Sequence, residues 1–550
     1  MIYHFGFFVL LCCLTIKKDP ALRIALQTNH SVMQNKKVKG FVLLLAAINL
    51  FVNHQVSGCF AVIVGKAASS DGSVIFGHLE QNGGLRNMSY FYVPRMYHDP
   101  GSFVDLRRGG KWPQEPVTYA YLWGNNTGAE FGDGYFNEWG VAIASDACPT
   151  REDSYEKLVA DGRITDGGIG YKLRRIVAQR ARTAKEGVMI AGELLDHFGY
   201  ATTGRTYIIA DADEAWLLAV AMGKNWIARR VPDDEIVLLP NVHIIGAEAD
   251  LHDTENVIAS RGLVEYAISR GWYDPAEGLP FSFREVYGAP APAGSFMYEQ
   301  GVDPRQWFSQ SLIHGELLQL PADKQLPFSV KPERKFTVVD VANILRSHGH
   351  TEGQEPNIEL SYMLGVKDNV TPHKQGGTGN ICSGRSQEMV VYQLRNWLPV
   401  EVGSIAWRTT AAPCGSVLVP WYSGITETPG PYRKDWDVEQ ALNIDFHFDP
   451  PDGTFNHDPE NAFDVFKALE NMIDLDYRNN ILTARNIWDP FEKDQFDLQP
   501  AVEKVALELI REDIDLARKF LTGYTGYRAM LALDTAKKLV NHFKTIHWAN

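Results

Sequence analysis

Cys59 is the residue whose type and position in this sequence point most directly to chemistry. It follows a leader-like apolar segment and comes directly before a run of apolar residues with strand character. Cleavage after Gly58 would make this cysteine residue one of the mature chain, with both a thiol and an α-amine. The unperturbed pKa of an α-amine is about 7.7–8.0, so a single residue would supply the nucleophile and the general base. We therefore expect Cys59 to be a catalytic nucleophile that uses its own amine as base.

The segment before Cys59 has the residue order of a secretory signal. Its two apolar stretches, 5–16 and 40–52, are each shorter than the ~20 apolar residues that span a bilayer. The second stretch follows three lysines and precedes a short polar run, with Val56 and Gly58 at the positions that a signal peptidase reads. We predict that residues 1–58 are a leader, that translation starts at Met33, and that the mature protein is exported to the periplasm or the cell exterior.

A lipid anchor is the alternative explanation of the same cysteine. The four residues 56–59 read VSGC, which fits the signal of a bacterial lipoprotein, in which the cysteine is acylated and has no catalytic role. A polar tether would be expected after such an anchor, but an apolar strand begins at once. This favours catalysis, while a non-catalytic surface lipoprotein anchored at Cys59 stays open.

Composition and charge describe an ordinary folded protein with an acidic surface. The 550 residues are 45% hydrophobic and 22% charged, and the formal net charge is −14, which excludes a disordered or collagen-like chain. An acidic surface repels phosphates and anionic lipids. We expect no nucleic-acid partner and no stable membrane span; a homo-oligomer stays open.

The remaining cysteines and histidines give little support for a metal site. Cys148, Cys382 and Cys414 would survive leader removal and could form a disulfide in an exported protein, but the sequence does not say which two would pair. No cysteines have CxxC spacing, and His348 and His350 near Glu352 do not form an HExxH helix. We expect no metal and no cofactor.

The pattern of apolar residues predicts a layered α+β protein. Short strands dominate residues 60–145 and 206–239, and helical spacing covers 170–182 and 184–198. Residues 251–337 are rich in proline and aromatics and are predicted to be an irregular insertion, after which 338–430 complete the body that 59–250 began. The tail, 431–550, is predicted to be a helical layer with helices at 459–477, 500–521 and 527–543.

Several motifs then resemble peptidase family C69, the cysteine dipeptidases. Residues 59–73 read CFAVIVGKAASSDGS, which is similar to the opening of that family: the cysteine, a strand, then VGK, AS and DGS. The similarity continues to the C-terminal half, in NEWGVA (137–142), YIIAD (207–211), EAW (214–216), QLRNWLP (393–399) and PWY (420–422).

This resemblance implies a fold and a mechanism. The family belongs to the N-terminal nucleophile hydrolases, so the implied fold is an αββα sandwich of two stacked antiparallel sheets with helices outside. The implied reaction is amide hydrolysis through an acyl-enzyme on Cys59, with a small peptide as substrate.

The resemblance also suggests which side chains stabilise the oxyanion. Asn137 opens the NEWGVA segment, and Asn241 follows a strand and a proline where the family has its second asparagine. Neutral amides suit this role because they donate hydrogen bonds without adding a buried charge. The alternative for both is a structural turn residue at a strand boundary.

Three residues after the second strand are the expected substrate-binding group. Related bile-salt and penicillin acylases have Gly-Arg-Asn-x-Asp here, whereas this chain has His78 at the arginine position and Gln81 at the aspartate position, with Glu80 beside it. His78 could hold the thiolate or bind a substrate carboxylate, or be a surface histidine at a strand end. Glu80 could hold the α-ammonium of Cys59 or of a dipeptide.

The sequence therefore predicts an exported cysteine-type dipeptidase or related exopeptidase. An acylase that cleaves a non-peptide amide is the alternative within the same class, because fold and nucleophile would be shared and only the pocket would differ.

Overall fold

The computed structural model describes residues 58–82, 88–129, 134–367, 370–434 and 436–549. The expected leader stretches, their lysines and Met33 lie outside the described residues. Residues 57–550 form one compact unit, so the expected divisions at 250, 337 and 430 stay predictions. Among the described residues, no helix has the length and apolar character needed to cross a bilayer.

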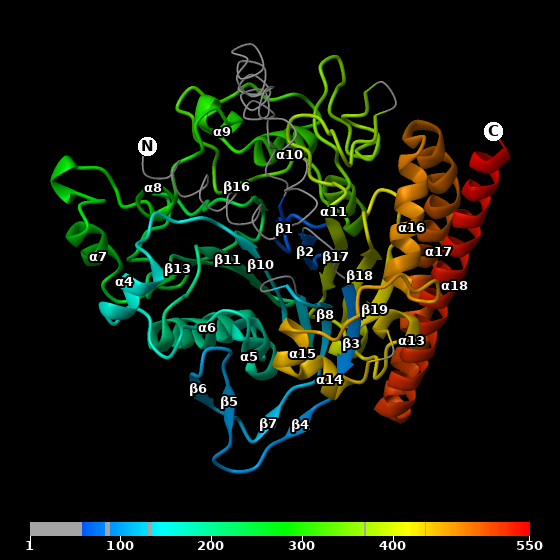
Figure 1. Cartoon of the computed structure of the whole chain (residues 1–550), viewed down its shortest axis with the longest axis horizontal. Helices are drawn as coiled ribbons and strands as arrows, with labels where there is room; N and C mark the ends of the chain where they lie inside the picture. Colours follow the sequence, from blue (N-terminus) through cyan, green and yellow to red (C-terminus); the bar gives the residue numbers. More distant parts are fainter. Residues whose placement is uncertain (1–57, 83–87, 130–133, 368–369, 435, 550) are drawn as a thin grey trace, which may run out of the picture. The chain divides into compact units, whose positions relative to one another are not determined.

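A seven-stranded antiparallel sheet holds both expected strands of the first hairpin at its centre (Figure 1). The strand that begins after Cys59 pairs with the next strand on one side and with a strand some 170 residues later on the other. Its strands, in spatial order, are β16 (Ser329–Val330), β14 (Ile236–Leu239), β1 (Phe60–Val64), β2 (Val74–Gln81), β17 (Ser386–Leu394), β18 (Ser404–Thr410) and β19 (Val419–Tyr422).

An eight-stranded sheet packs against the first one. Its strands, in spatial order, are β15 (Val257–Ala259), β13 (Trp226–Arg230), β12 (Ala215–Val220), β11 (Arg205–Ala210), β10 (Ala142–Ala147), β9 (Gly134–Asn137), β8 (Tyr121–Asn126) and β3 (Met88–Val93). Apolar side chains of both sheets, such as Phe60 and Ile63 from one and Ile208 and Leu217 from the other, belong to a single buried cluster. Two small hairpins extend from this sheet: β4 (Met96–Tyr97) with β7 (Val117–Thr118), and β5 (Phe103–Asp105) with β6 (Lys111–Pro113).

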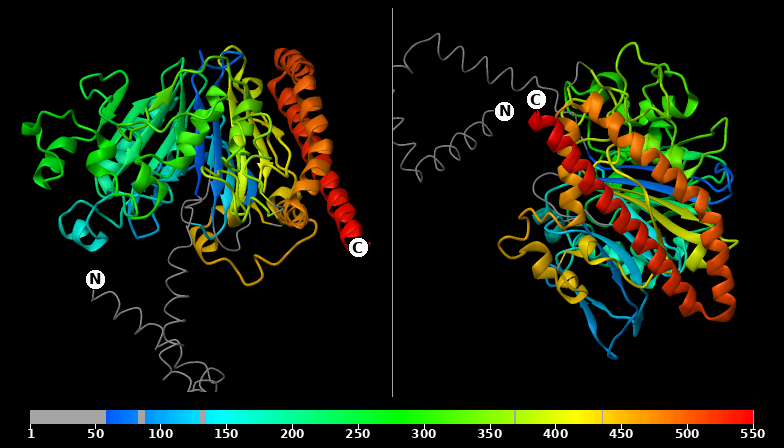
Figure 2. Two further views of the ribbon diagram at one scale, coloured as in Figure 1. Left: turned by 90° about the horizontal axis from the view of Figure 1, so that it is seen from above. Right: turned by 90° about the vertical axis from the view of Figure 1, so that its right-hand side faces the viewer.

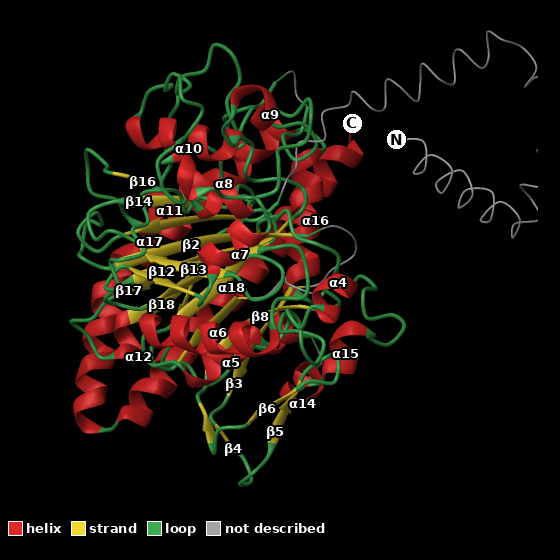
Figure 3. Ribbon diagram, turned by 90° about the vertical axis from the view of Figure 1, so that its left-hand side faces the viewer, coloured by secondary structure: helices red, strands yellow, loops and turns green. Residues whose placement is uncertain are grey.

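Helices cover the outer face of each sheet. On the eight-stranded sheet lie α5 (Leu173–Arg180) and α6 (Ala184–Phe198), whose first turn is capped by Thr183. The seven-stranded sheet is covered by α11 (Val338–Leu345), α16 (Ala462–Asp474), α17 (Tyr477–Glu512) and α18 (Ile514–Ala549). In the left view of Figure 2 the orange and red helices lie along the outer side of the yellow strands, and Figure 3 shows strands enclosed by helices. The order helix, sheet, sheet, helix confirms the predicted αββα sandwich.

The predicted insertion is made of short elements that connect the two sheets. It contains the strands β15 and β16, one at the edge of each sheet, and short helices between them. The helices of this region are α7 (Leu263–Ser269), η2 (Pro275–Glu277), α8 (Phe283–Tyr287), α9 (Phe296–Gln300) and α10 (Pro304–His314). The other short helices in the described part of the chain are α4 (Tyr155–Ala160), α12 (Val400–Gly403), α13 (Gly430–Arg433), α14 (Val438–Leu442) and α15 (Ile444–Phe448).

Of the three predicted C-terminal helices, 459–477 corresponds to α16, whereas the boundaries of the other two were wrong. The expected break before residue 500 does not exist, because α17 runs through Pro490 and Pro500 without interruption. The chain instead reverses at Asp513, whose backbone is extended. A proline inside a helix removes one hydrogen bond and strains the turn, but here packing of α17 against α16, α18 and β19 outweighs that loss.

Candidate active site

Cys59 lies at the head of β1, in the middle of the seven-stranded sheet. Phe60 pairs with Leu79 of β2, so Cys59 is placed opposite Glu80. The Cys59 thiol donates a hydrogen bond to Glu80 Oε1 at 3.3 Å and accepts one from the Gln81 backbone N–H at 3.5 Å. Only 8% of Cys59 is exposed. The thiol is therefore a buried group held by two neighbours on the adjacent strand.

His78 and Glu80 share one face of β2 because successive side chains of a strand point to opposite faces. The sequence analysis ended this strand at Gly77, but β2 continues to Gln81 and every residue in it is buried. The alternative of a surface histidine at a strand end was therefore wrong. His78 is placed on the inner face, directed toward the second sheet.

Asp146, at the end of β10, joins His78 across the space between the sheets. His78 Nε2 lies 2.8 Å from Asp146 Oδ1, and both side chains are almost fully buried. Burial lowers the pKa of His78, but the Asp146 carboxylate outweighs burial, and the net effect raises this pKa above its ordinary value. The pair therefore favours an imidazolium next to the nucleophile.

Burial also shifts the pKa values of the thiol and of Glu80. The pKa of Cys59 is well above its ordinary value because of burial and the nearby carboxylates of Glu80 and Asp146. Burial raises the pKa of Glu80 to about 7, although His78 and Arg174 act in the opposite direction. Glu80 Oε2 is buried and has no hydrogen-bond partner among the described residues. The thiol thus needs a proton acceptor in the reaction, and the Glu80 carboxyl beside it becomes negatively charged only as the pH rises through about 7.

Gln81 points away from this group, to the other face of β2. Its side-chain amide donates to the Ile381 carbonyl and to Ser386 Oγ, which belong to the segment leading into β17. Its backbone N–H, and not its side chain, contacts the thiol. Gln81 is thus placed to fix the strand at the nucleophile.

Asn241 and Arg305 hold the backbone on the other side of Cys59. The Asn241 amide donates to the Ala147 carbonyl at 3.0 Å, and its oxygen accepts from Arg305 at 3.2 Å. Arg305, on α10, also donates to the carbonyl oxygens of Gly58 at 2.8 Å and of Cys59 at 3.2 Å. A side-chain amide has two N–H groups, so Asn241 keeps a second donor next to the nucleophile.

Asn137 is not part of this group. Both of its amide hydrogens are donated to carbonyl oxygens at the end of α5, and its oxygen accepts from the backbone N–H groups of Trp139 and Val141. It precedes the start of β10, whereas Cys59 lies near the end of that strand, on the order of 15 Å away at ~3.3 Å per residue. The geometry supports the turn-residue alternative, because no Asn137 donor is left for an oxyanion.

Asp146 and Arg305 were missed by the sequence analysis. The predicted strand at β10 stopped at Ser145, which left Asp146 out, although an acidic residue on the small-residue face of an apolar strand was a usable signal. Arg305 lies in the region that was predicted to be irregular, and its spacing from Cys59 gave no signal.

Cys59, His78 and Asp146 also bring three ligand-type atoms within 4.8 Å of one another. The hydrogen bonds already described occupy the thiol, one imidazole nitrogen and one carboxylate oxygen. These contacts are those of a nucleophile among proton-transfer groups.

The αββα layers, with a buried thiol at the head of a central strand, are the fold of the N-terminal nucleophile hydrolases. Residues 58–488 match the model of peptidase family C69, and the chain belongs to that family. The predicted resemblance is thereby confirmed.

Relatives of the chain carry dipeptidase names. A probable dipeptidase of Latilactobacillus sakei is 26% identical over 69% of this chain and 77% of its own length. A dipeptidase of Bifidobacterium longum is 28% identical, covering 68% of this chain and 73% of its own. A probable dipeptidase of Salmonella dublin is 27% identical, covering 69% and 84%.

Solved structures of the conjugated bile acid hydrolase from Clostridium perfringens also match. Two variants of that enzyme show 12% and 10% identity and TM-scores of 0.26 and 0.28, and each match covers 64% of this chain and 89% of the other.

Proposed function

We propose that the protein is a dipeptidase whose nucleophile is Cys59, exposed as the N-terminal residue when the leader is removed on export. The observation that carries this proposal is the position of the thiol: it is buried at the head of a central strand, 3.3 Å from a carboxylate with a pKa of about 7. The names of the relatives support dipeptides as the substrates.

The reaction begins with attack of the Cys59 sulfur on the carbonyl carbon of the scissile amide. The thiol proton passes to the α-amine of Cys59, and Glu80 Oε2 is placed to accept a hydrogen bond from the resulting ammonium. The carbonyl π electrons move to oxygen, where the second N–H of Asn241 and the Arg305 guanidinium supply donors.

Collapse of this intermediate breaks the C–N bond, and the ammonium gives its proton to the leaving amine. Water then attacks the thioester carbonyl carbon, and the α-amine takes up its proton. Collapse of this second intermediate breaks the C–S bond and releases the acid, and the ammonium returns its proton to the Cys59 thiolate. Imidazolium His78, fixed by Asp146, offsets negative charge on sulfur during both steps.

The backbone before Cys59 supports removal of the leader. Arg305 donates to the Gly58 carbonyl, and a Cβ atom added to Gly58 would lie 2.1 Å from Asn241 Oδ1. Gly58 therefore occupies the space beside both donor groups that a substrate carbonyl would need. Cleavage of the Gly58–Cys59 bond opens that space.

The burial of the thiol argues against the lipid-anchor alternative. A diacylglyceryl group on Cys59 Sγ would have to displace Glu80, and an acylated amine would no longer accept a proton. We take the exported, unacylated form as the functional one.

The test replaces Cys59 with alanine in protein that starts at residue 59. Turnover of dipeptides should fall to background, because the nucleophile is lost, while the circular dichroism spectrum and thermal midpoint stay close to those of the wild type. A thiol-alkylating reagent should inactivate the wild type in step with labelling of Cys59, followed by mass spectrometry. Undiminished turnover by Cys59→Ala would contradict the proposal.

A further inference from the structure

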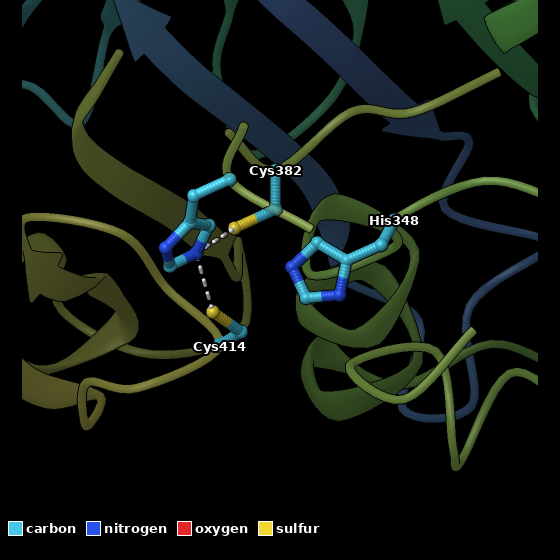
Figure 4. Close-up of side chains that lie close together, drawn as sticks. His348, Cys382 and Cys414 are labelled. Carbon is cyan, nitrogen blue, oxygen red and sulfur yellow. Dashed lines mark hydrogen bonds between the residues drawn. The ribbon is translucent and has the colours of Figure 1, made fainter. Parts of the chain in front are cut away.

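Four side chains of metal-binding types lie close together outside the active site, although no single sequence motif contains them. His348 follows α11, His373 and Cys382 lie in the long connection between α11 and β17, and Cys414 lies between β18 and β19. One ligand atom from each lies within 4.8 Å of every other. Figure 4 shows His348, Cys382 and Cys414 converging on one point.

The distances suit a tetrahedral ion. Zn–S bonds of about 2.3 Å and Zn–N bonds of about 2.0 Å place the ligand atoms of a tetrahedron roughly 3.3–3.8 Å apart. His373 Nε2 lies 3.1 Å from Cys414 Sγ and 3.9 Å from Cys382 Sγ, which brackets that range.

The group is costly to bury without an ion. His348, Cys382 and Cys414 have no exposed surface, and the His373 side chain is 2% exposed. Neither ring nitrogen of His348 has a hydrogen-bond partner among the described residues. Buried polar atoms are normally hydrogen-bonded, so an imidazole directed at two sulfurs with no such partner points to a ligand.

The charge balance selects a divalent cation. Two thiolates and two neutral imidazoles around a divalent cation have no net charge, which suits a dry interior. The thiol protons leave to solvent when the ion binds.

The surroundings complete a zinc environment. His373 Nδ1 lies 2.8 Å from Asp474 Oδ1 at the end of α16, so this carboxylate orients the imidazole and leaves Nε2 directed at the sulfurs. Carboxylate–histidine–metal arrangements of this kind are common around zinc. The Tyr477 ring packs against both imidazoles, with centroid separations of 5.6 and 5.7 Å.

We propose that His348, His373, Cys382 and Cys414 form a structural zinc site that ties the α11–β17 connection to the β18–β19 connection and to α16. The geometry is that of a closed His₂Cys₂ site with no place for substrate. Ile381, next to Cys382, accepts the hydrogen bond of the Gln81 side chain, so the ion would also steady the strand that contacts the nucleophile.

The first test is metal analysis of the full protein, produced in zinc-supplemented medium and purified without chelators. About one zinc per chain is expected in the wild type, and less than about a tenth of that in Cys382→Ser and Cys414→Ser. Cys148→Ser is the matched control, because Cys148 is equally buried and hydrogen-bonds to the Asp146 carbonyl outside the cluster. Cys59→Ala should also keep its zinc.

A second measurement uses the wild type alone, so it does not depend on whether the ligand variants fold. Titration of the wild type with a mercurial reagent should release the bound zinc to a colorimetric indicator, and cobalt(II) exchanged into the site should give the visible bands of a tetrahedral thiolate complex. Folded wild type that holds no zinc and takes up no cobalt would overturn the proposal. A disulfide between Cys382 and Cys414 in the native protein, or loss of zinc in Cys59→Ala, would overturn it as well.

Discussion

The ionised form of Glu80 is the form that catalysis needs, but ionisation of this buried side chain lowers the stability of the fold. Its pKa is about 7 in the folded protein and 4.5 ordinarily, so the folded state binds more protons than the unfolded state between these values. The free energy of unfolding therefore falls as pH rises from about 4.5 through 7. A buried carboxylate that must ionise for catalysis thus weakens the fold at the pH where it works.

We predict that Glu80→Gln is less active but more stable at high pH. In the wild type, kcat/KM should rise as the pH rises through ~7. The variant should lack this rise, and its kcat/KM should be lower by about 100-fold or more. Above pH 7 the variant should be more stable by up to on the order of 3 kcal/mol. Pre-steady-state dipeptide hydrolysis and urea unfolding across pH measure both effects; a wild-type pH profile retained by the variant would exclude Glu80 as the titrating group.

Asp146 governs the protonation of its partner His78. The raised pKa of His78 stabilises the fold below its unfolded value of 6.5, and this contribution is lost as pH rises through the higher folded value. We predict that Asp146→Asn lowers the pKa of His78, destabilises the protein at pH 6 by about 3 kcal/mol, and lowers kcat more than it raises KM. NMR titration of His78 distinguishes this from a general loss of structure; an unchanged His78 pKa would contradict it.

The sequence predicted the residues of the first hairpin better than their partners. Cys59, His78 and Glu80 lie within one continuous motif, and the structure brings them together where the adjacent strands β1 and β2 pair. Asn137 was wrongly expected to stabilise the oxyanion, because its position in the motif does not show which groups its N–H donors bond to. Arg305 and the four residues of the His₂Cys₂ group come from segments that are distant in the sequence. Their proximity depends on tertiary packing, which the local spacing of residues does not show.

At the scale of elements, α5 and α6 were predicted closely because each has apolar residues at helical spacing, and α6 begins at a threonine cap. The long helices α17 and α18 were divided wrongly, because the amphipathic stretch 500–521 was predicted to be one helix although it spans the end of α17 and the start of α18. Packing decided otherwise. Glu492 of α17 shows how: it pairs with Arg346 and Arg485 and accepts the Leu418 backbone N–H from the sheet side.

We predict that Glu492→Ala loosens the helical layer from the seven-stranded sheet. The change leaves the buried Arg346 guanidinium without a counter-charge, whereas Arg485 keeps Asp489. Breaking a buried pair in this way costs about 3–5 kcal/mol. The pKa of Glu492 is lowered, because the two arginines outweigh burial, so its contribution is present above pH 4.5 and is lost as pH falls through the folded value.

The matched control is Glu508→Ala on the same helix, which removes an exposed pair with Arg511 and should change stability by less than ~0.5 kcal/mol. Chemical unfolding of the two variants measures the difference. Equal effects would show that the buried pair does not hold α17 in place.

For the whole molecule, activity depends on where the chain begins. A residue before Cys59 converts its amine into an amide with no useful basicity and keeps the space beside Arg305 and Asn241 filled. We predict that protein retaining residues 33–58 is inactive and that protein starting at Cys59 is active. Dipeptide turnover by both forms, each with its N-terminus verified by mass spectrometry, is the measurement; equal rates would contradict the role of the α-amine.

The pairing of β2 with β17 determines when this activity can arise during synthesis. Gln81 and Ser386 meet across 305 residues of sequence, and contacts of such long separation form late. A nascent chain that has emerged from the ribosome only as far as β14 contains Cys59 but not β17, the strand that pairs with one side of β2. The strand that carries His78 and Glu80 therefore gains its second neighbour only when residues 386–394 have been made, so a polypeptide that ends before β17 presents an open β edge at β2.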